Sequence, residues 1–162
     1  MEFMDVVRRR RSIRRYKPDP VPDHVLEQVL EAARLAPSAG HRQPWHFIVV
    51  KDPKTRQRLG IASWAAEAPV VIVGCTDPET SPMWHIVDLT IAFEHLVLAA
   101  ANFELGTCWW PPRPGFDEHI KEVLGIPEHM RVVAVTPLGY PAETPGPKAR
   151  KSLSEIVHYD KF

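Results

Sequence analysis

Apolar residues recur along the chain in two alternating patterns, which predict helices and strands in turn. Apolar positions at helical spacing, together with helix-start signals, predict helices at 2–10, 22–33 and 116–124, with a short polar helix at 54–59. Short runs rich in β-branched residues predict strands at 47–50, 69–75 and 131–135, and a shorter strand at 108–110. Runs as uniformly apolar as 69–75 are typical of strands covered on both faces.

The segment 86–101 stands out because 12 of its 16 residues are apolar, and it contains neither Gly nor Pro. It is therefore expected to be a helix that is buried nearly all round. In a chain of this size, one way to bury such a helix is to place the sheet on one side and a second subunit on the other. We therefore predict a homodimer, and we expect His95 on this helix to be a hydrogen-bonded core residue.

Length and composition place the chain among ordinary globular proteins. The 162 residues, 44% hydrophobic and 25% charged, predict one domain spanning 1–162 with a sizeable core. Cys75 and Cys108 give no disulfide framework or metal-ligand spacing, so both are expected to be packed thiols and no metal is expected. No apolar run reaches membrane length, so a cytoplasmic protein without a membrane partner is the expectation.

Strands that alternate with helices predict an α+β or α/β three-layer sandwich, although layer rules leave the strand order open. Charge is unevenly distributed within this chain. The net charge is +0, yet residues 8–17 carry seven of the 20 basic side chains. Such a cluster has three interpretations: a solvated face, a nucleic-acid contact, or a site for a small phosphate. Arg guanidinium groups and the Ser12 hydroxyl suit the third.

A loop between the second predicted helix and the first predicted strand is a candidate binding site. The helix stops at Pro37, and Gln43-Pro44-Trp45 leads into the strand. Ser38 and Gly40 allow close approach of backbone to a flat ligand, and the Gln43 amide can both donate and accept. The alternative is an ordinary helix C-terminus and turn with a core Trp.

Two further segments near the C-terminus can likewise be interpreted either as part of a binding site or as ordinary turn and tail. Gly139, in Thr136-Pro137-Leu138-Gly139-Tyr140-Pro141, marks a place where only backbone fits, or an ordinary turn. Lys148 and Arg150 begin a tail that is either solvated or part of a site. Because a buried phosphate dianion needs more than one cation, this segment and the N-terminal arginines could converge on one phosphate.

Together these motifs resemble the nitroreductase family of FMN enzymes. The resemblance covers Arg10-x-Ser12-x-Arg14, Ala36-Pro37-Ser38 with Gln43-Pro44-Trp45, the Gly-Tyr-Pro turn, and Lys148-x-Arg150. These motifs occur in the family's order between Val6 and Val157. The resemblance implies an α+β three-layer sandwich with a mixed, mostly antiparallel sheet, in an obligate dimer with two FMN sites at the interface.

The resemblance also implies which residues contact the cofactor. The two basic segments are expected to bind the phosphate. The 37–43 loop, in part that of the partner subunit, is expected to contact the edge of the ring. The backbone of Gly139 is expected to lie near flavin N5. Arg14 and Gly139 are expected to tune the ring, and no side chain need act as nucleophile. The implied contacts are Arg10, Arg11, Ser12, Arg14, Pro37, Ser38, His41, Gln43, Leu138, Gly139, Lys148 and Arg150.

The implied activity is an FMN-dependent oxidoreductase that passes electrons from NADH or NADPH to a small acceptor by a ping-pong mechanism. Nitro compounds, quinones and free flavin are the candidate acceptors. Two alternatives remain: a flavin carrier without turnover, and a nucleic-acid-binding module that uses the 8–15 cluster. Residues 63–68 and 112–116 are expected to be free to cover a pocket.

Overall fold

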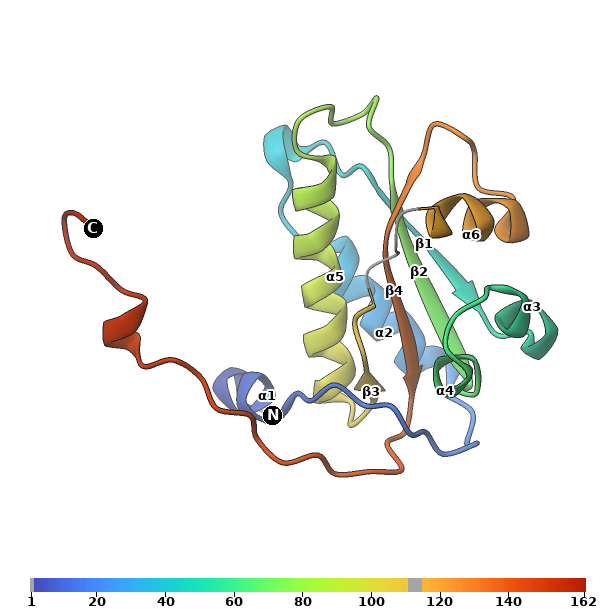
Figure 1. Cartoon of the computed structure of the whole chain (residues 1–162), viewed down its shortest axis with the longest axis horizontal. Coiled ribbons are helices and arrows are strands. Elements are labelled where there is room, and N and C mark those ends of the chain that lie inside the picture. The colour runs from blue at the N-terminus through green and yellow to red at the C-terminus, as the bar shows by residue number, and fades with distance from the viewer. Residues whose placement is uncertain (1, 111–114) are drawn as a thin grey trace.

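A four-stranded sheet forms the middle layer of the protein. The computed structural model describes residues 2–110 and 115–162. The strands lie in the order β1-β2-β4-β3, and each pair of neighbours is antiparallel (Figure 1). One parallel bridge joins Ser12 to Thr107 at the β3 edge. The strands are β1 (Trp45–Val50), β2 (Val70–Thr76), β3 (Gly106–Thr107) and β4 (Arg131–Gly139).

Helices cover both faces of this sheet, as Figure 1 shows: α2 and α5 lie on one side, and α3, α4 and α6 on the other. The predicted helices are confirmed, with ends shifted by one or two residues. The helices are α1 (Phe3–Arg9), α2 (Asp23–Arg34), α3 (Pro53–Arg58), α4 (Ser63–Ala66), α5 (His85–Asn102) and α6 (Phe116–Leu124); two 3-10 turns are η1 (Ala39–His41) and η2 (Leu153–Glu155).

Strand β2 contributes side chains to two separate hydrophobic clusters, because its side chains alternate between the two faces of the sheet. Val70 and Ile72 pack with α2 and α5. Val71 and Val73 pack on the opposite face, in the cluster that contains Ile120 of α6. Every residue of β2 is buried, as its uninterrupted apolar sequence predicted. The three-layer α+β architecture is thereby confirmed.

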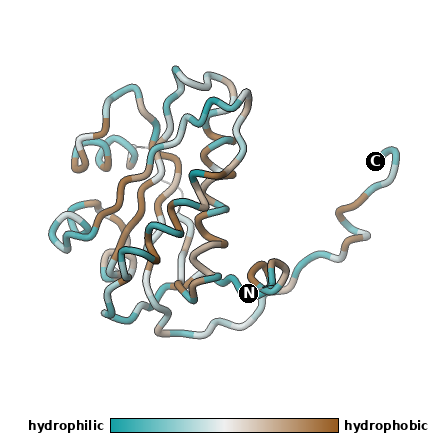
Figure 2. The backbone as a smooth tube through the Cα atoms, turned by 180° about the vertical axis from the view of Figure 1, so that it is seen from behind, coloured by the Kyte–Doolittle hydropathy of each residue, from teal (hydrophilic) through white to brown (hydrophobic). Residues whose placement is uncertain are grey.

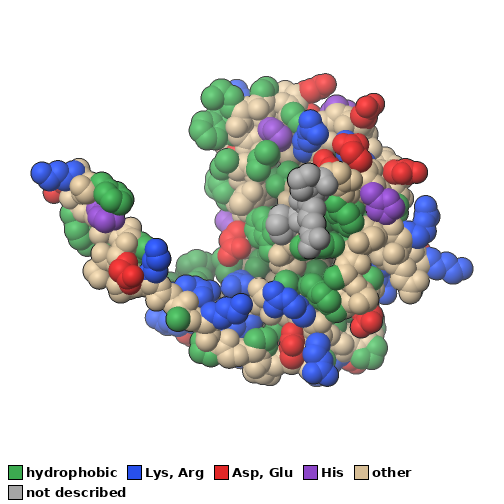
Figure 3. Space-filling view, in the orientation of Figure 1, with side chains coloured by type: hydrophobic (Ala, Val, Ile, Leu, Met, Phe, Trp, Pro, Cys, Tyr) green, Lys and Arg blue, Asp and Glu red, His purple; other side chains and the backbone are tan. Residues whose placement is uncertain are grey.

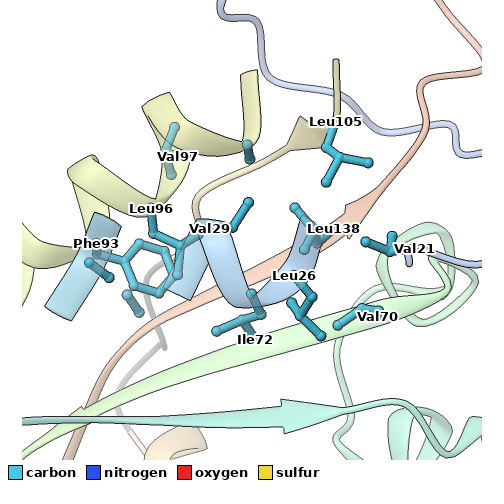
Figure 4. Packing of buried hydrophobic residues seen from close by; sticks show 13 residues of the cluster. Val21, Leu26, Val29, Val70, Ile72, Phe93, Leu96, Val97, Leu105 and Leu138 are labelled. Atoms are coloured by element: carbon cyan, nitrogen blue, oxygen red, sulfur yellow. The ribbon is translucent and has the colours of Figure 1, made fainter. Parts of the chain in front are cut away.

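Helix α5 supplies much of the first cluster. Phe93, Leu96 and Val97 of α5 meet Val29 of α2 above the sheet (Figure 4). The Nδ1 atom of His95 lies 3.3 Å from the Ala32 carbonyl oxygen, consistent with the expected hydrogen bond, but the side chain is half-buried and not part of the core.

One strip of α5 is not covered within a single chain. Ile86 is 52% exposed, Val87 47% and Ile91 36%, and Met83 and Trp84 just before the helix are exposed as well. Despite this apolar character, no helix in the described part of the chain is long and apolar enough to cross a membrane.

The sequence misplaced the third strand. Gly106 does not end helix α5, which stops at Asn102, but lies within β3. The expected strand at 108–110 is reduced to one bridge between Trp110 and Val135. A Cβ atom at Gly106 would lie 2.7 Å from Cγ1 of Ile13, so glycine allows the N-terminal segment to pack against β3 at this point.

Strand β4 also continues four residues beyond its predicted end, through Pro137. Proline is rare inside a sheet because it lacks a backbone donor. Here Pro137 is paired with Val71 of β2, but on the other side of β4 it lies just outside the ladder with β3, which pairs only with Leu138 and Gly139. The backbone N–H of Cys108 donates instead to the Thr136 hydroxyl.

Residues 15–17, near the N-terminus, lie beside residues 140–142, which follow β4 and precede the C-terminal tail. The backbone N–H of Lys17 donates to Tyr140 O, and that of Ala142 donates to Arg15 O, each over 2.8–2.9 Å. Beyond this contact the tail runs away from the body of the protein (Figure 2). Its apolar residues are exposed: Leu153 (75%), Ile156, Val157, Tyr159 and Phe162.

Candidate functional site

A basic cavity of about 720 Å³ lies between the N-terminal segment and the start of the tail. Its lining brings together six of the predicted residues from both ends of the chain: Arg10, Arg11, Ser12, Arg14, Lys148 and Arg150. Arg8 also lines the cavity, and no acidic residue does so among the described residues. Basic side chains gather along this edge in the space-filling view (Figure 3).

Backbone pairing explains why residues so far apart in sequence meet here. The backbone N–H of Ile13 donates to Thr107 O, which ties the N-terminal segment to β3. Tyr16 bridges to Pro141, two residues after the end of β4. The hydroxyl of Tyr16 donates to Ile13 O over 2.5 Å, and burial raises the pKa of this hydroxyl well above its usual range. The segment that carries Arg10, Ser12 and Arg14 is therefore fixed along its length.

Individual arginines are partly held by the backbone around them. One Arg11 nitrogen donates to Arg8 O at 2.6 Å and to Arg10 O at 2.8 Å. One Arg150 nitrogen donates to Lys148 O and Ala149 O. The Arg14 guanidinium lies 5.9 Å from the ring centroid of Trp64, a cation–π contact that the sequence did not predict.

Leu138 and Gly139 end the central strand β4 and can offer only backbone atoms. The Leu138 side chain is fully buried in the core. A Cβ atom at Gly139 would lie 2.6 Å from Cδ of Pro69, so the glycine is required by packing against the chain itself. The expectation that only backbone fits at Gly139 agrees with this geometry.

The predicted ring-edge residues Pro37, Ser38, His41 and Gln43 form a separate loop between α2 and β1. Pro37, His41 and Gln43 are exposed, and Ser38 is half-buried. The Ser38 hydroxyl accepts the Gln43 backbone N–H at 2.9 Å, which closes the loop. His41 and Gln43 have φ angles of 56° and 50°, a left-handed conformation that no signal in the sequence indicated.

The structure does not bring this loop to the basic cavity within one chain. The Ala39 N–H binds Asp88 in the first turn of α5, whereas Ile13 binds Thr107, beyond the last turn of the same helix. Figure 1 shows the loop and the N-terminal segment near opposite ends of α5. Eighteen residues make a helix about 27 Å long, which exceeds the length of an FMN molecule.

The remaining expectations have mixed outcomes. Cys75 and Cys108 are buried and unpaired, and burial raises the pKa of the Cys75 thiol to about 11, as expected for packed thiols. The prediction that residues 63–68 are free to cover a pocket is wrong, because this segment contains helix α4 and its Ala65 and Ala68 are buried. Most of the other expected cover, 112–116, lies outside the described residues.

Comparison with known proteins places this geometry in a family. The model of the nitroreductase family matches residues 7–66 and 58–140, and the chain belongs to that family. A Methanothermobacter thermautotrophicus protein, provisionally named an NADH dehydrogenase/NAD(P)H nitroreductase, is 37% identical over 90% of this chain and 81% of its own length.

Two further comparisons agree. An NADH dehydrogenase of Thermus thermophilus is 34% identical, covering 92% of this chain and 91% of its own. The solved structure of an FMN-dependent nitroreductase from Clostridium difficile superimposes with a TM-score of 0.87 at 32% identity, over 98% of this chain and 99% of that one.

Proposed function

We propose that this chain is an FMN-dependent oxidoreductase that takes electrons from NADH or NADPH and passes them to a small acceptor by a ping-pong mechanism. The observation that carries the proposal is the basic cavity, because its six Arg and Lys side chains, together with Ser12, match the charge and the acceptor oxygens of a phosphate. The names of the similar proteins support the flavin and the nicotinamide donor.

When bound, the flavin supplies two-electron transfer between the donor and the acceptor. The residues of this chain bind and orient it. Arg10, Ser12, Lys148 and Arg150 hold the phosphate, and Arg14, in the same cavity, supplies positive charge that favours the reduced ring. The backbone at Gly139 would lie near the ring, while the space beside its Cα is filled by Pro69 of the same chain.

The site is completed by a second copy of the chain in this proposal. The uncovered strip of α5, with Val87 and Ile91, provides an apolar face for a two-fold contact. If two α5 helices pack antiparallel, the 37–43 loop of one protomer lies beside the basic cavity of the other. This arrangement resolves the separation of the two groups within one chain and makes two equivalent sites.

The exposed tail fits the same assembly. Leu153, Ile156 and Tyr159 contact no core in the single chain. Exposed apolar side chains in this number are typical of a segment that docks on another surface. We infer that the tail packs on the partner protomer, which also anchors Lys148 and Arg150 at the cavity.

The phosphate assignment is tested with FMN and riboflavin, which differ only in the phosphate. The double variant Arg10→Ala/Arg150→Ala is expected to lose affinity for FMN by about 100-fold or more, because two charge-assisted contacts disappear. Its affinity for riboflavin is expected to stay near that of the wild type. Fluorescence quenching of each flavin during titration measures both constants.

A matched control removes the same charge elsewhere. Arg58→Ala/Arg131→Ala takes two exposed arginines from outside the cavity and should leave FMN affinity unchanged. Normal FMN affinity in the Arg10/Arg150 variant would contradict the phosphate assignment. A wild-type protein that binds no flavin but binds RNA with steep salt dependence would favour the nucleic-acid alternative.

A further inference from the structure

A buried carboxylate, Asp88, attaches the first part of the exposed 37–43 loop to the core. We propose that Asp88 is a positioning residue for flavin binding, which holds this loop in the conformation that presents its ring-facing groups. Asp88 itself does not touch the cofactor in this account. The inference rests on the proposed function, because it concerns how the proposed ring contacts are held in place.

Both oxygens of Asp88 are engaged within the protein. The side chain is 2% exposed, in the first turn of an otherwise largely apolar helix. Its Oδ1 accepts the Ala39 backbone N–H at 2.8 Å, and its Oδ2 accepts the Ser81 hydroxyl at 3.0 Å. A carboxylate at this depth is tolerated only when its acceptors are satisfied, so these contacts fix its position.

The conformation of the loop needs such a fixed point. Gly40, His41 and Gln43 all have φ between 50° and 59°, within four consecutive positions. Residues other than glycine adopt this conformation rarely, and they keep it where the surrounding structure determines it. The Asp88 contact binds the amide directly before this strained stretch.

A second attachment holds the other end of the loop. The Pro44 carbonyl oxygen accepts the Asp77 backbone N–H at 2.9 Å and the Thr76 hydroxyl at 3.2 Å. Residues 40–43 are all exposed, and they lie between the two attached residues, Ala39 and Pro44. Removal of the Asp88 carboxylate would release one end and let the strained residues relax away from the ring-binding conformation.

The test compares flavin binding by Asp88→Ala and Asp88→Asn with that of the wild type. Asp88→Ala is expected to weaken binding of both FMN and riboflavin by roughly 10-fold, since it acts at the ring and not at the phosphate. The ratio of the two dissociation constants should therefore stay constant. The visible circular dichroism of the bound flavin should change, because the ring loses an ordered neighbour.

Asp88→Asn should restore most of the affinity, because the amide oxygen can accept from Ala39 and the NH2 group can donate to the Ser81 oxygen. Ser81→Ala is a milder change, and it should weaken the binding of both flavins as Asp88→Ala does. It provides the test if Asp88→Ala does not fold. Ile120→Val, which removes one methyl group from the core on the other face of the sheet, is the control for a general loss of stability.

Wild-type affinity and an unchanged dichroism spectrum in Ser81→Ala would overturn the proposal, as would an Asp88→Asn variant as impaired as Asp88→Ala. If Ile120→Val produced the same flavin defect, positioning by Asp88 would also be overturned. These outcomes differ from failure of the proposed function, in which the wild-type protein itself binds neither flavin.

Discussion

At the scale of single residues, the sequence indicated most of the residues that line the basic cavity, but neither the backbone conformation of the 37–43 loop nor the contact between Arg14 and Trp64. The Arg10-x-Ser12-x-Arg14 motif and a distant Lys-x-Arg pair are visible in the sequence, and their residues line one cavity. The left-handed conformations of His41 and Gln43 are not visible, because neither residue type demands them. The contact of Arg14 with Trp64 also depends on where α4 packs, which no local pattern encodes.

Gly139 gives a prediction at this scale. Gly139→Ala should lower the free energy of unfolding by about 1–3 kcal/mol, since its Cβ would overlap the Pro69 ring at 2.6 Å. Urea denaturation measures the change. Gly146→Ala is the control, because nothing lies within 4 Å of its Cβ and its stability should be unchanged or slightly higher. Equal stability of the two variants would show that the close approach to Pro69 is not a constraint.

At the scale of elements, periodicity predicted what local sequence determines. The long apolar run of α5 and the β-branched run of β2 each identified their element, with ends correct to about a residue. Strand β3 was misplaced because its position depends on Ile13, more than 90 residues away in the sequence, and not on its own residues. The predicted end of strand β4 was too early because proline usually ends a strand. Pro137 is tolerated here because it lies just outside the ladder with β3.

Helix α3 offers a pH-dependent test of its N-cap. Hydrogen bonds from the Thr55 hydroxyl and backbone N–H hold the pKa of Asp52 below its usual value of 3.8. A lowered folded-state pKa stabilises the protein above the ordinary pKa, and this contribution is lost as pH falls through the folded value. The stability advantage of the wild type over Asp52→Asn should therefore shrink as the pH falls from about 6 to about 3.

Urea midpoints of both proteins at the two pH values provide the measurement. Asn can accept the same backbone N–H, so this variant keeps the cap and removes only the titration. The other carboxyl groups are common to both proteins and cancel in the difference. A difference in midpoint that does not vary with pH would contradict the role given to the Asp52 charge.

At the scale of the whole molecule, the proposed flavin site depends on a homodimer. The apolar strip of α5 was expected to be covered, and it is the exposed face on which the proposed contact lies. Ile91→Glu places a charge in that face and should shift the protein to monomers with weak flavin binding. Sedimentation velocity measures the assembly, with Gln57→Glu on exposed α3 as the charge-matched control. A dimeric Ile91→Glu protein with normal flavin affinity would exclude this interface.

Shared sites give a sharper prediction at the same scale. Arg10→Ala/Arg150→Ala removes the phosphate contacts, and His41→Ala/Gln43→Ala removes ring contacts. If each site takes its cavity from one protomer and its loop from the other, a hybrid of the two variants has one intact site and one doubly altered site. Co-refolded mixtures should therefore recover FMN binding that neither parent shows. No recovery in verified hybrids would mean that each site is built from one chain.

The central claim, that this chain is a flavin oxidoreductase, is tested most directly by one spectrum. The purified protein is mixed with FMN, desalted, and titrated without oxygen with NADH and then NADPH. We predict that flavin absorbance co-elutes with the protein and bleaches on addition of a nicotinamide donor. Co-eluting flavin that does not bleach would contradict the proposed donor and favour a carrier, and absence of retained flavin would contradict the account as a whole.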